Sequence, residues 1–359
     1  MSTRVLVIAG AGVNHNGSLK LARRLVEEAA AAGADIVKFQ TFKADALTTA
    51  AAPKAAYQKR TTGDADSQRE MLRWLELDEA SHRSLHQHCE DHGIEFLSTA
   101  FDLESVSLLA DRLGVRRMKI PSGEIVNGPL LLAVARTGLP TILSTGMSTL
   151  DEIEEALGVL AFGLLGEPGA PGRKTFAEAF ASDAGRRALA EKVSILQCTT
   201  EYPTPPGDVN LRAMDTLAKR FGLPVGLSDH TAELHVAVAA VARGARILEK
   251  HFTLDRTLEG PDHAASLEPA GFAELVRQIR DVELALGSGE KKPAPSELPN
   301  RAIARGSLVA ARPITAGELF NERNVTVKRP GTGRSPMDLW EILGRPAPRA
   351  FDVDEAIET

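Results

Sequence analysis

The chain has 359 residues, of which 43% are hydrophobic and 25% are charged, and its formal net charge is −6. This balance is typical of a folded globular protein, and the acidic charge without a long basic run excludes nucleic acids and anionic membranes as partners. Two cysteines, Cys89 and Cys198, cannot form a disulfide framework and lack the spacing of a metal motif. The apolar run 5–9 is too short for a signal peptide and no segment is long enough to span a bilayer, so we expect a cytoplasmic protein.

The first expected element is a strand over 5–10, VLVIAG, which runs into Gly12, Asn14 and His15. A dinucleotide-binding turn needs a further glycine three residues after Gly12, where this chain has His15. The GKS or GKT sequence of a phosphate loop is also missing at this turn. A nucleotide site is therefore disfavoured, and the polar Asn14–His15 pair at a strand end needs another explanation.

Seven further strands are expected along the chain, each a short apolar or β-branched run: 36–40, 95–100, 116–122, 141–146, 194–198, 224–230 and 246–252. Helical patterns alternate with them, from Ser18 to Gly33 and over about 77–91, 104–113, 129–137, 149–161, 211–220, 234–243 and 270–286. Eight strand–helix units in this order match a (β/α)8 TIM barrel. A doubly wound sheet is the alternative, but it rarely needs eight units in strict alternation.

The composition changes after the last expected helix, which indicates a second domain. We expect a barrel domain over 1–286, a Gly/Pro/Lys-rich linker over 287–303 and a small β-rich domain over 304–359, with a short helix at 336–344. Within the barrel domain, 163–187 is a long insert before the sixth strand, which we interpret as a surface excursion.

Every expected barrel strand ends in polar residues, and active sites of this fold lie at those ends. Lys38 and Lys119 end the second and fourth strands, where an unpaired ammonium group is costly. The surrounding strand ends supply hydroxyl groups: Thr99, Ser122, Ser144 and Ser228. Two lysines among hydroxyls suit a phosphate or a carboxylate. A Schiff-base lysine is the rival interpretation, and a pair of snorkelling lysines is the structural one.

His230 and His251 end the seventh and eighth strands, which are neighbours in a barrel. Two histidines with acids nearby suggest a divalent metal site, although single histidines are more often structural. Glu249 lies two residues before His251, so the pleat points both side chains the same way and Glu249 can support the ligands. Asp262 and His263, in the following loop, add ligands or hydrogen-bond partners.

The expected helix over 77–91 and the residue after it carry several histidines, in SHRSLHQHCEDHG. His88 and His92 are spaced i, i+4 and therefore lie on one side of the helix. We interpret this surface as a solvated face without chemistry.

Long motifs at the strand ends resemble those of the bacterial sialic acid synthase family: AGVNHNGSLKLA, GADIVKFQTFKA, KIPSGEI, CTTEYPTP, GLSDHT, EKHFTLDRTLEGPDHAASLEP and VKRPGTG. The likeness covers nearly the whole chain, including a C-terminal antifreeze-like (SAF) domain. CTTEYP and TLDRTLEGPDHAASLEP are most similar to the N,N'-diacetyllegionaminate synthases, and the N-acetylneuraminate synthases share most of the pattern. The resemblance implies an enzyme that condenses phosphoenolpyruvate with an N-acylated mannose-type aldehyde sugar and releases phosphate.

The resemblance also implies roles for individual residues. Phosphoenolpyruvate is expected to be held by Lys38, Thr99, Lys119, Ser122, Ser144, Tyr202 and Ser228, and Mn2+ or Mg2+ by His230 and His251. Glu124 and Asp262 match positions that address the acceptor sugar, and Gln40 is a hydrogen-bonding residue. Arg329, in the SAF domain, matches an arginine that reaches the partner's barrel in a domain-swapped homodimer.

One departure from the family pattern lies in the first strand. The family has Ile-Ala-Glu-x-Gly there, and this chain has Ile8-Ala9-Gly10-Ala11-Gly12, so a carboxylate is replaced by Gly10. Three functional classes therefore remain open: a working sugar-acid synthase, a Schiff-base aldolase, and a family member with weak catalysis or altered specificity.

Overall fold

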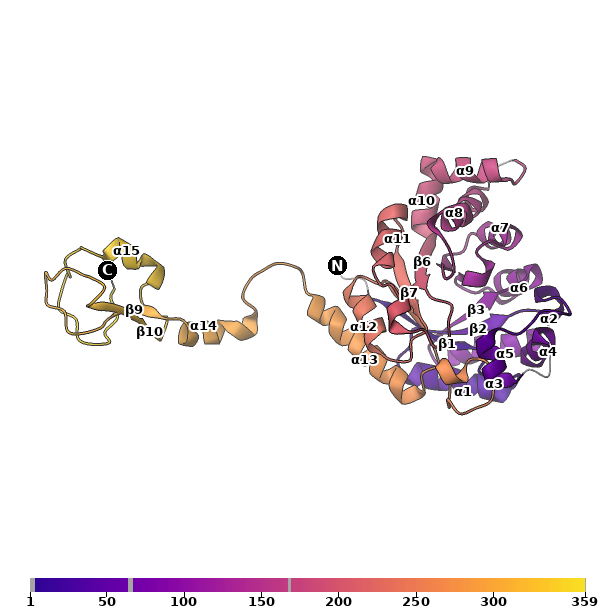
Figure 1. The fold of residues 1–359 in the computed structure, drawn as a ribbon, viewed down its shortest axis with the longest axis horizontal. Coiled ribbons are helices and arrows are strands. Elements are labelled where there is room, and N and C mark those ends of the chain that lie inside the picture. Colours follow the sequence, from indigo (N-terminus) through magenta and orange to yellow (C-terminus); the bar gives the residue numbers. More distant parts are fainter. Residues whose placement is uncertain (1–3, 64–66, 167–168, 359) are drawn as a thin grey trace. The chain divides into compact units, whose positions relative to one another are not determined.

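The computed structural model of the chain describes residues 4–63, 67–166 and 169–358. The chain divides into two compact units, Met1–Gly287 and Ser288–Thr359. The first unit contains a strand barrel with its helices, and the second contains two short strands and short helices (Figure 1).

Eight parallel strands close into a barrel in sequence order. β1 pairs with both β2 and β8, and Gly10 is the residue of β1 that faces Lys38 on one side and His251 on the other. The strands are β1 (Leu6–Gly12), β2 (Ile36–Thr41), β3 (Glu95–Ala100), β4 (Met118–Ile120), β5 (Thr141–Ser144), β6 (Val193–Cys198), β7 (Val225–Asp229) and β8 (Ile247–His251). The expected TIM barrel is confirmed.

A helix follows each strand and packs on the outside of the barrel (Figure 1). Helix α1 shows the local signals: the Ser18 hydroxyl accepts a hydrogen bond from the Leu21 amide at its start, and the chain leaves through Gly33 at φ +81°. These helices are α1 (Leu19–Ala31), α5 (Glu79–Asp91), α6 (Leu103–Ser107, continued by a π-helical segment Leu108–Leu113), α7 (Gly128–Arg136), α8 (Leu150–Leu165), α11 (Ala213–Phe221), α12 (His235–Ala242) and α13 (Pro269–Leu286).

Additional helices occupy two of the connections. The segment between β2 and α5 holds α2 (Ala44–Leu47), α3 (Ala56–Thr62) and α4 (Gln68–Leu75), which the sequence analysis did not anticipate. The insert 163–187 begins at the end of α8 and continues through α9 (Arg173–Ala181) into α10 (Asp183–Lys192). The Phe176 ring of α9 lies 5.3 Å from the Phe162 ring of α8, so the insert packs on the barrel helices instead of forming an irregular excursion.

The barrel interior is apolar at one end and polar at the other. Alternation along the strands sends one set of residues outward to the helices and another set inward. The inward apolar layer consists of Ile8, Ile36, Leu97, Ile142, Leu196 and Ile247. Two residues further along their strands, Lys38 and Glu249 point inward in the same way, so the polar layer lies toward the carboxyl ends.

The second unit has a small core of its own, with Leu308, Phe320, Ile342, Phe351 and Ile357 buried in it. Its antiparallel strands are β9 (Ser307–Ala310) and β10 (Val325–Lys328), and its helices are α14 (Leu298–Ala304) and α15 (Leu339–Ile342). Helix α14 and a 3-10 turn at Pro295–Glu297 lie in the segment that the composition marks as a linker. The other 3-10 turns of the chain are Ser122–Glu124, Pro206–Asp208, His263–Ala265 and Pro336–Asp338.

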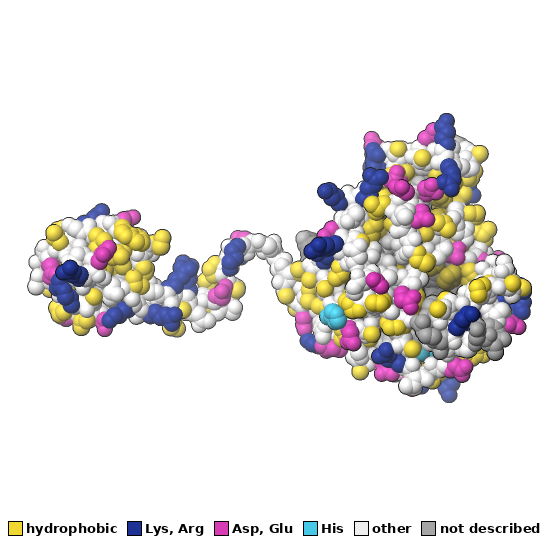
Figure 2. Space-filling model, viewed as in Figure 1, with side chains coloured by type: hydrophobic (Ala, Val, Ile, Leu, Met, Phe, Trp, Pro, Cys, Tyr) yellow, Lys and Arg dark blue, Asp and Glu magenta, His cyan; other side chains and the backbone are white. Residues whose placement is uncertain are grey.

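Basic and acidic side chains are interspersed on the face drawn in Figure 2, without a broad area of either sign. That face therefore lacks the continuous positive surface that nucleic acids need. Among the described residues, no helix combines the length and the apolar character that crossing a membrane requires.

Candidate active site

A buried cluster of charges lies above the apolar layer of the barrel. The Glu249 carboxylate of β8 lies between two lysines, with Oε1 at 3.1 Å from Lys38 Nζ and Oε2 at 3.9 Å from Lys119 Nζ. The Ser228 hydroxyl of β7 donates to Glu249 Oε1 at 3.0 Å. All three charged residues are buried: Lys38 is 5% exposed, Lys119 is 2% exposed and Glu249 is 4% exposed. Two buried cations with one anion leave a net positive charge in the barrel.

The pKa values of this cluster reflect burial and mutual attraction. Burial lowers the pKa of Lys119 to about 8, against the opposing pull of Glu249 and with a further lowering by Lys38. Burial alone would raise the pKa of Glu249, but the two ammonium groups outweigh it and hold this pKa well below its usual range. Glu249 is therefore ionised at neutral pH, and Lys119 loses its charge under mildly alkaline conditions.

Hydroxyl groups from the neighbouring strands surround the lysines. Lys119 Nζ donates to Ser144 Oγ at 2.6 Å and to the carbonyl of Ile120 at 3.1 Å. Thr99 is buried on β3 directly opposite Lys119 in the register. Ser122 accepts a hydrogen bond from the Gly146 amide at 2.9 Å, which holds the β4 and β5 loops together. These hydroxyls and ammonium groups form a cradle of donors that matches a small, multiply charged anion.

A pair of histidines lies beside this cradle. The rings of His230 and His251 are 5.3 Å apart between centroids, and the Tyr202 ring lies 4.3 Å from His230 and 5.5 Å from His251. His230 Nδ1 donates to the Thr199 carbonyl at 2.7 Å, and its Nε2 lies 3.3 Å from Ser228 Oγ. Within the described residues His251 Nδ1 is buried without a hydrogen-bond partner.

Asp262 brings a carboxylate to the histidines. Its Oδ2 lies 3.9 Å from His251 Nδ1, and burial raises the pKa of Asp262 to about 6. Burial also lowers the pKa of His251 well below its usual value, so this imidazole is neutral at physiological pH. The orphaned nitrogen of His251 and the second imidazole of His230 are donors of the kind that a divalent metal accepts, and the Asp262 carboxylate lies beside them.

The end of β1 is open toward these groups because Gly10 and Gly12 have no side chains. A Cβ placed on Gly12 would lie 3.5 Å from Asp262 Oδ2, 3.6 Å from Gln40 Nε2 and 3.8 Å from His251 Cε1. Gly10 faces inward between Lys38 and His251 and contributes no side chain to the polar layer. A Cβ on Gly10 would lie 3.2 Å from the Lys250 carbonyl oxygen, so a side chain fits there only with a small backbone shift.

Two of the predicted site residues lie apart from this group. Glu124 sits half-buried in the 3-10 turn after β4, where its Oε2 accepts from Asn127 Nδ2 at 2.7 Å. Arg329 follows β10 in the second unit and is exposed. The structure thus places Lys38, Thr99, Lys119, Ser144 and Ser228 around the buried cradle, while Arg329 belongs to a different unit.

The Asn14–His15 pair after β1 is structural. The Asn14 amide donates to the Phe252 carbonyl and to Ser266 Oγ, both at 2.9 Å, and so ties the β1 end to the chain after β8. The His15 ring is fully buried, accepts from the Gly17 amide at 3.0 Å and lies 6.1 Å from the Phe39 ring. The hydrogen bonds of this pair order the first loop, while Asn14 Oδ1 and His15 Nε2 are buried without a partner among the described residues.

Cys198 was not anticipated as a site residue. Its thiol lies 3.8 Å from His230 Nδ1, and a Cβ on Gly146 would lie 3.3 Å from it and 2.5 Å from Thr200 Oγ1. The signal was present in the sequence, because Cys198 shares the inward parity of Leu196 on the same strand.

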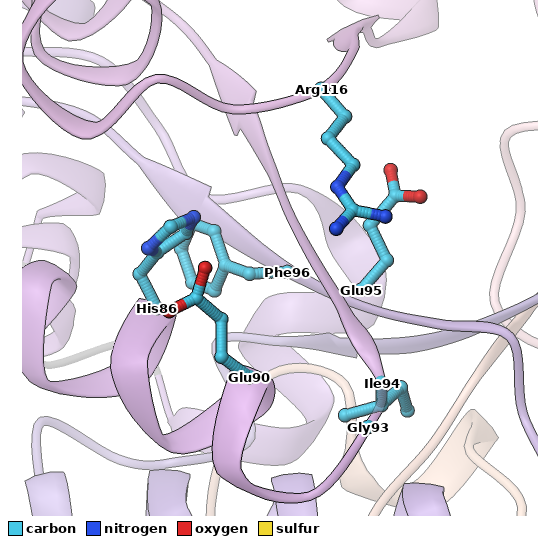
Figure 3. Close-up of a pocket in the computed structure, with 7 residues that line it drawn as sticks. All are labelled: His86, Glu90, Gly93, Ile94, Glu95, Phe96 and Arg116. Carbon is cyan, nitrogen blue, oxygen red and sulfur yellow. The ribbon is translucent and has the colours of Figure 1, made fainter.

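A surface pocket lies at the other end of the strands. Its lining includes Gly93, Ile94 and Glu95, which lead into β3 from its amino end, together with Phe96, Arg116, and His86 and Glu90 of α5 (Figure 3). In the TIM fold this end serves stability, so the pocket is separate from the polar layer.

The carboxyl end of this parallel barrel presents two lysines, ordered hydroxyls and a histidine pair. Such a site is typical of enzymes that bind a small anionic substrate. The chain belongs to the NeuB family, whose model matches residues 25–291, and the SAF-domain model matches residues 305–358. The family resemblance of the strand-end motifs is thereby confirmed.

Two bacterial relatives match almost end to end. An N,N'-diacetyllegionaminic acid synthase of Campylobacter jejuni is 48% identical over 99% of both chains. One of Legionella pneumophila is 45% identical over 96% of this chain and 90% of the relative. Among solved structures, an N-acetylneuraminic acid synthetase of Leptospira borgpetersenii is 32% identical, with a TM-score of 0.66 over 83% of this chain and 90% of that one.

Proposed function

We propose that this chain is a nonulosonic acid synthase, which joins phosphoenolpyruvate to an N-acylated mannose-type aldehyde sugar and releases phosphate. The observation that carries the proposal is the buried Lys38–Glu249–Lys119 cluster with its hydroxyls, because it matches a trianionic substrate. The two relatives named for N,N'-diacetyllegionaminic acid, at 48% and 45% identity, favour a diacetamido-trideoxy sugar as acceptor. N-acetylmannosamine is the alternative acceptor.

In the proposed reaction, the lysines and hydroxyls hold the phosphate and carboxylate of phosphoenolpyruvate. Carbon 3 of phosphoenolpyruvate attacks the aldehyde carbon, which forms the new C–C bond and turns the aldehyde oxygen into a hydroxyl. Water adds to carbon 2, and the tetrahedral intermediate expels phosphate. Lys38 and Lys119 stabilise the departing phosphate as charge accumulates on it. Asp262, Gln40 and Glu124 are proposed to address the sugar, and the raised pKa of Asp262, about 6, suits proton donation to the aldehyde oxygen.

We further propose that His230 and His251 hold a divalent metal, for which Mn2+ suits two imidazoles better than Mg2+ with its preference for oxygen. A bound metal supplies polarisation of the aldehyde. The His230–Thr199 hydrogen bond orients the ring with Nε2 on the side of Ser228, and the neutral His251 offers its orphaned nitrogen.

A Schiff-base aldolase is the second candidate, and the pKa of Lys119, about 8, is the observation that favours it. Against it, Lys119 Nζ is already held by Ser144 and the Ile120 carbonyl and lies beside an anion. Borohydride added with the aldehyde sugar or with a 2-oxo acid such as pyruvate separates the two reactions, because only an imine between Lys119 and a carbonyl is trapped as a covalent adduct. We expect no adduct in this protein.

The assembly proposed for the enzyme is a domain-swapped homodimer in which Arg329 of one protomer completes the site of its partner. Arg329 is an exposed cation at the end of a short strand and makes no hydrogen bond or ion pair within the described residues. A cytoplasmic location is proposed as well, in keeping with the free thiols of Cys89 and Cys198.

Phosphate release by the purified chain tests the proposal. EDTA is expected to abolish it and Mn2+ to restore it, and His230→Ala or His251→Ala should lose metal and activity together. His86→Ala, which changes a histidine at the opposite end of the barrel, is the matched control and should retain both. Full activity after rigorous chelation would refute the metal, and no phosphate release with any acceptor would refute the synthase.

A further inference from the structure

A second group of metal-binding side chains lies on the outside of the barrel. Glu27 of α1, His88 of α5 and His92, just after α5, bring one donor atom each to within 4.8 Å of one another. His88 Nε2 and Glu27 Oε1 are 3.1 Å apart. Two donors bound about 2.0–2.1 Å from a tetrahedral zinc ion lie about 3.4 Å apart, so this pair is already close to the required spacing.

The two histidines have the arrangement of a helical chelate. Their i, i+4 spacing puts the rings on the same side of the helix, and the ring centroids are 4.3 Å apart. His92 Nδ1 donates to the His88 carbonyl at 2.8 Å, which fixes the neutral tautomer and leaves the lone pair of Nε2 free for a metal. Such a hydrogen bond to a carbonyl is what metal-bound histidines usually make.

The group is also accessible from solvent. The side chains of His88 and Glu27 are 18% and 47% exposed, and His92 is exposed. The three donor atoms, which lie within 4.8 Å of one another, would have to move slightly closer to bind one ion. Rotamer changes of these surface side chains are enough for that, and the buried core does not have to move. His86, on the same helix, is directed elsewhere: it lies against Phe96 and lines the pocket of Figure 3.

We propose that Glu27, His88 and His92 form an external site for a zinc-class transition-metal ion, with three protein ligands and an open fourth position. Two imidazoles with one carboxylate suit Zn2+ and disfavour Mg2+, which requires mainly oxygen ligands. An ion in this position links α1 to the end of α5 and so joins two helices that pack beside one another on the barrel. The site is independent of the proposed synthase activity, because none of its ligands faces the barrel interior.

Zinc titration of the full-length chain tests this site. In a His230→Ala/His251→Ala background, which removes the proposed inner histidines, we expect one equivalent of Zn2+ to bind and to raise the melting temperature. Adding His92→Gln should weaken binding at least about tenfold, since even residues that merely support a ligand contribute that much. Glu27→Gln should weaken it too, and His86→Gln is the matched control that should leave it unchanged.

The wild-type chain provides a second measurement that does not depend on the inner variants. His92→Gln should remove one class of Zn2+ binding and leave phosphate release unchanged. Unchanged zinc affinity in His92→Gln, or an equal loss in His86→Gln, would overturn the external site. Neither result bears on the synthase, whose own test is phosphate release.

Discussion

At the scale of single residues, Glu249 helps to keep the buried Lys119 charged. Burial lowers the pKa of Lys119 most, the Glu249 carboxylate opposes this and Lys38 lowers the pKa further, so that the pKa is about 8. An ammonium group is present below its pKa and lost above it, so phosphoenolpyruvate binding should weaken as pH rises through about 8. Without Glu249 the pKa of Lys119 would be lower, so the lysine would lose its proton at a lower pH.

Glu249→Gln should therefore shift this loss to lower pH. At pH 7.5 we expect kcat/KM for phosphoenolpyruvate to fall by about ten- to a hundredfold, the value of one charged hydrogen bond of about 1.5–3 kcal/mol. The profile of kcat/KM between pH 7 and 9.5 measures the shift, and Glu283→Gln, near the other end of the barrel, is a control. An identical pH profile in Glu249→Gln would show that Lys119 does not report on substrate binding.

Gly10 is the residue at which this chain departs from its family's pattern. It faces inward between Lys38 and His251, and a Cβ there would lie 3.2 Å from the Lys250 carbonyl. Gly10→Glu should raise turnover with an N-acetylated hexose by about ten- to a hundredfold, through one charged hydrogen bond to the acceptor, if the backbone yields slightly. The KM for phosphoenolpyruvate should stay nearly unchanged.

Steady-state kinetics of both forms, with a diacetamido-trideoxy sugar and with N-acetylmannosamine, decide the role of Gly10. Gly10→Ala is the control, since it introduces the same Cβ contact without a carboxylate. If Gly10→Glu lowers activity with every acceptor while Gly10→Ala does not, the glycine is an adaptation to this enzyme's own substrate.

At the scale of elements, α7 and α8 approach each other closely at Gly163 of α8. A Cβ on Gly163 would lie 2.4 Å from the Ala135 Cβ of α7, which has no flexible side chain to move away. In an open helix, glycine to alanine gains about 1 kcal/mol. Here overpacking should cost about 1–3 kcal/mol instead, so Gly163→Ala should lower the free energy of unfolding.

Urea denaturation monitored by circular dichroism measures this effect. Gly128→Ala is the matched control, because Gly128 begins α7 and a Cβ there meets nothing within 4 Å. A Gly163→Ala protein as stable as the wild type would mean that α7 and α8 separate at little cost.

The barrel strands were predictable because each is a short apolar run with a polar end, flanked by turn residues. The helices α2 to α4 were not, since 44–75 lacks a long amphipathic period and α4 gains its order by burying Met71, Leu72 and Leu75 in a local cluster. Parity along a strand also separates Lys38, which faces the cradle, from Lys250, which pairs with buried Asp229 at 2.7 Å. Both lysines lie within barrel strands, and only the side of the strand on which each side chain lies distinguishes them.

At the scale of the whole molecule, the question is whether Arg329 of the SAF domain acts in the barrel of its own chain or in that of a partner chain. The candidate site of the barrel was largely predictable, because fold and strand ends together place Lys38, Lys119 and the histidines. Arg329 was proposed only from resemblance, and it lies in a separate unit with its own core. Chain connectivity alone leaves both arrangements open, within one protomer or between two.

Complementation between two inactive variants distinguishes these arrangements. Lys119→Ala removes the phosphate-binding cation of the barrel, and Arg329→Ala removes the cation of the second unit; each alone should be nearly inactive. In a swapped dimer of the two variants, the barrel that retains Lys119 receives the SAF domain that retains Arg329, so one of its two sites is intact. After random subunit exchange of an equal mixture, about a quarter of wild-type activity should return, as two-fold symmetry dictates. Arg323→Ala, which changes another exposed arginine of the second unit, is the control and should retain activity without a partner. If mass spectrometry shows that heterodimers form and no activity returns, Arg329 acts within its own chain or has no role in the reaction.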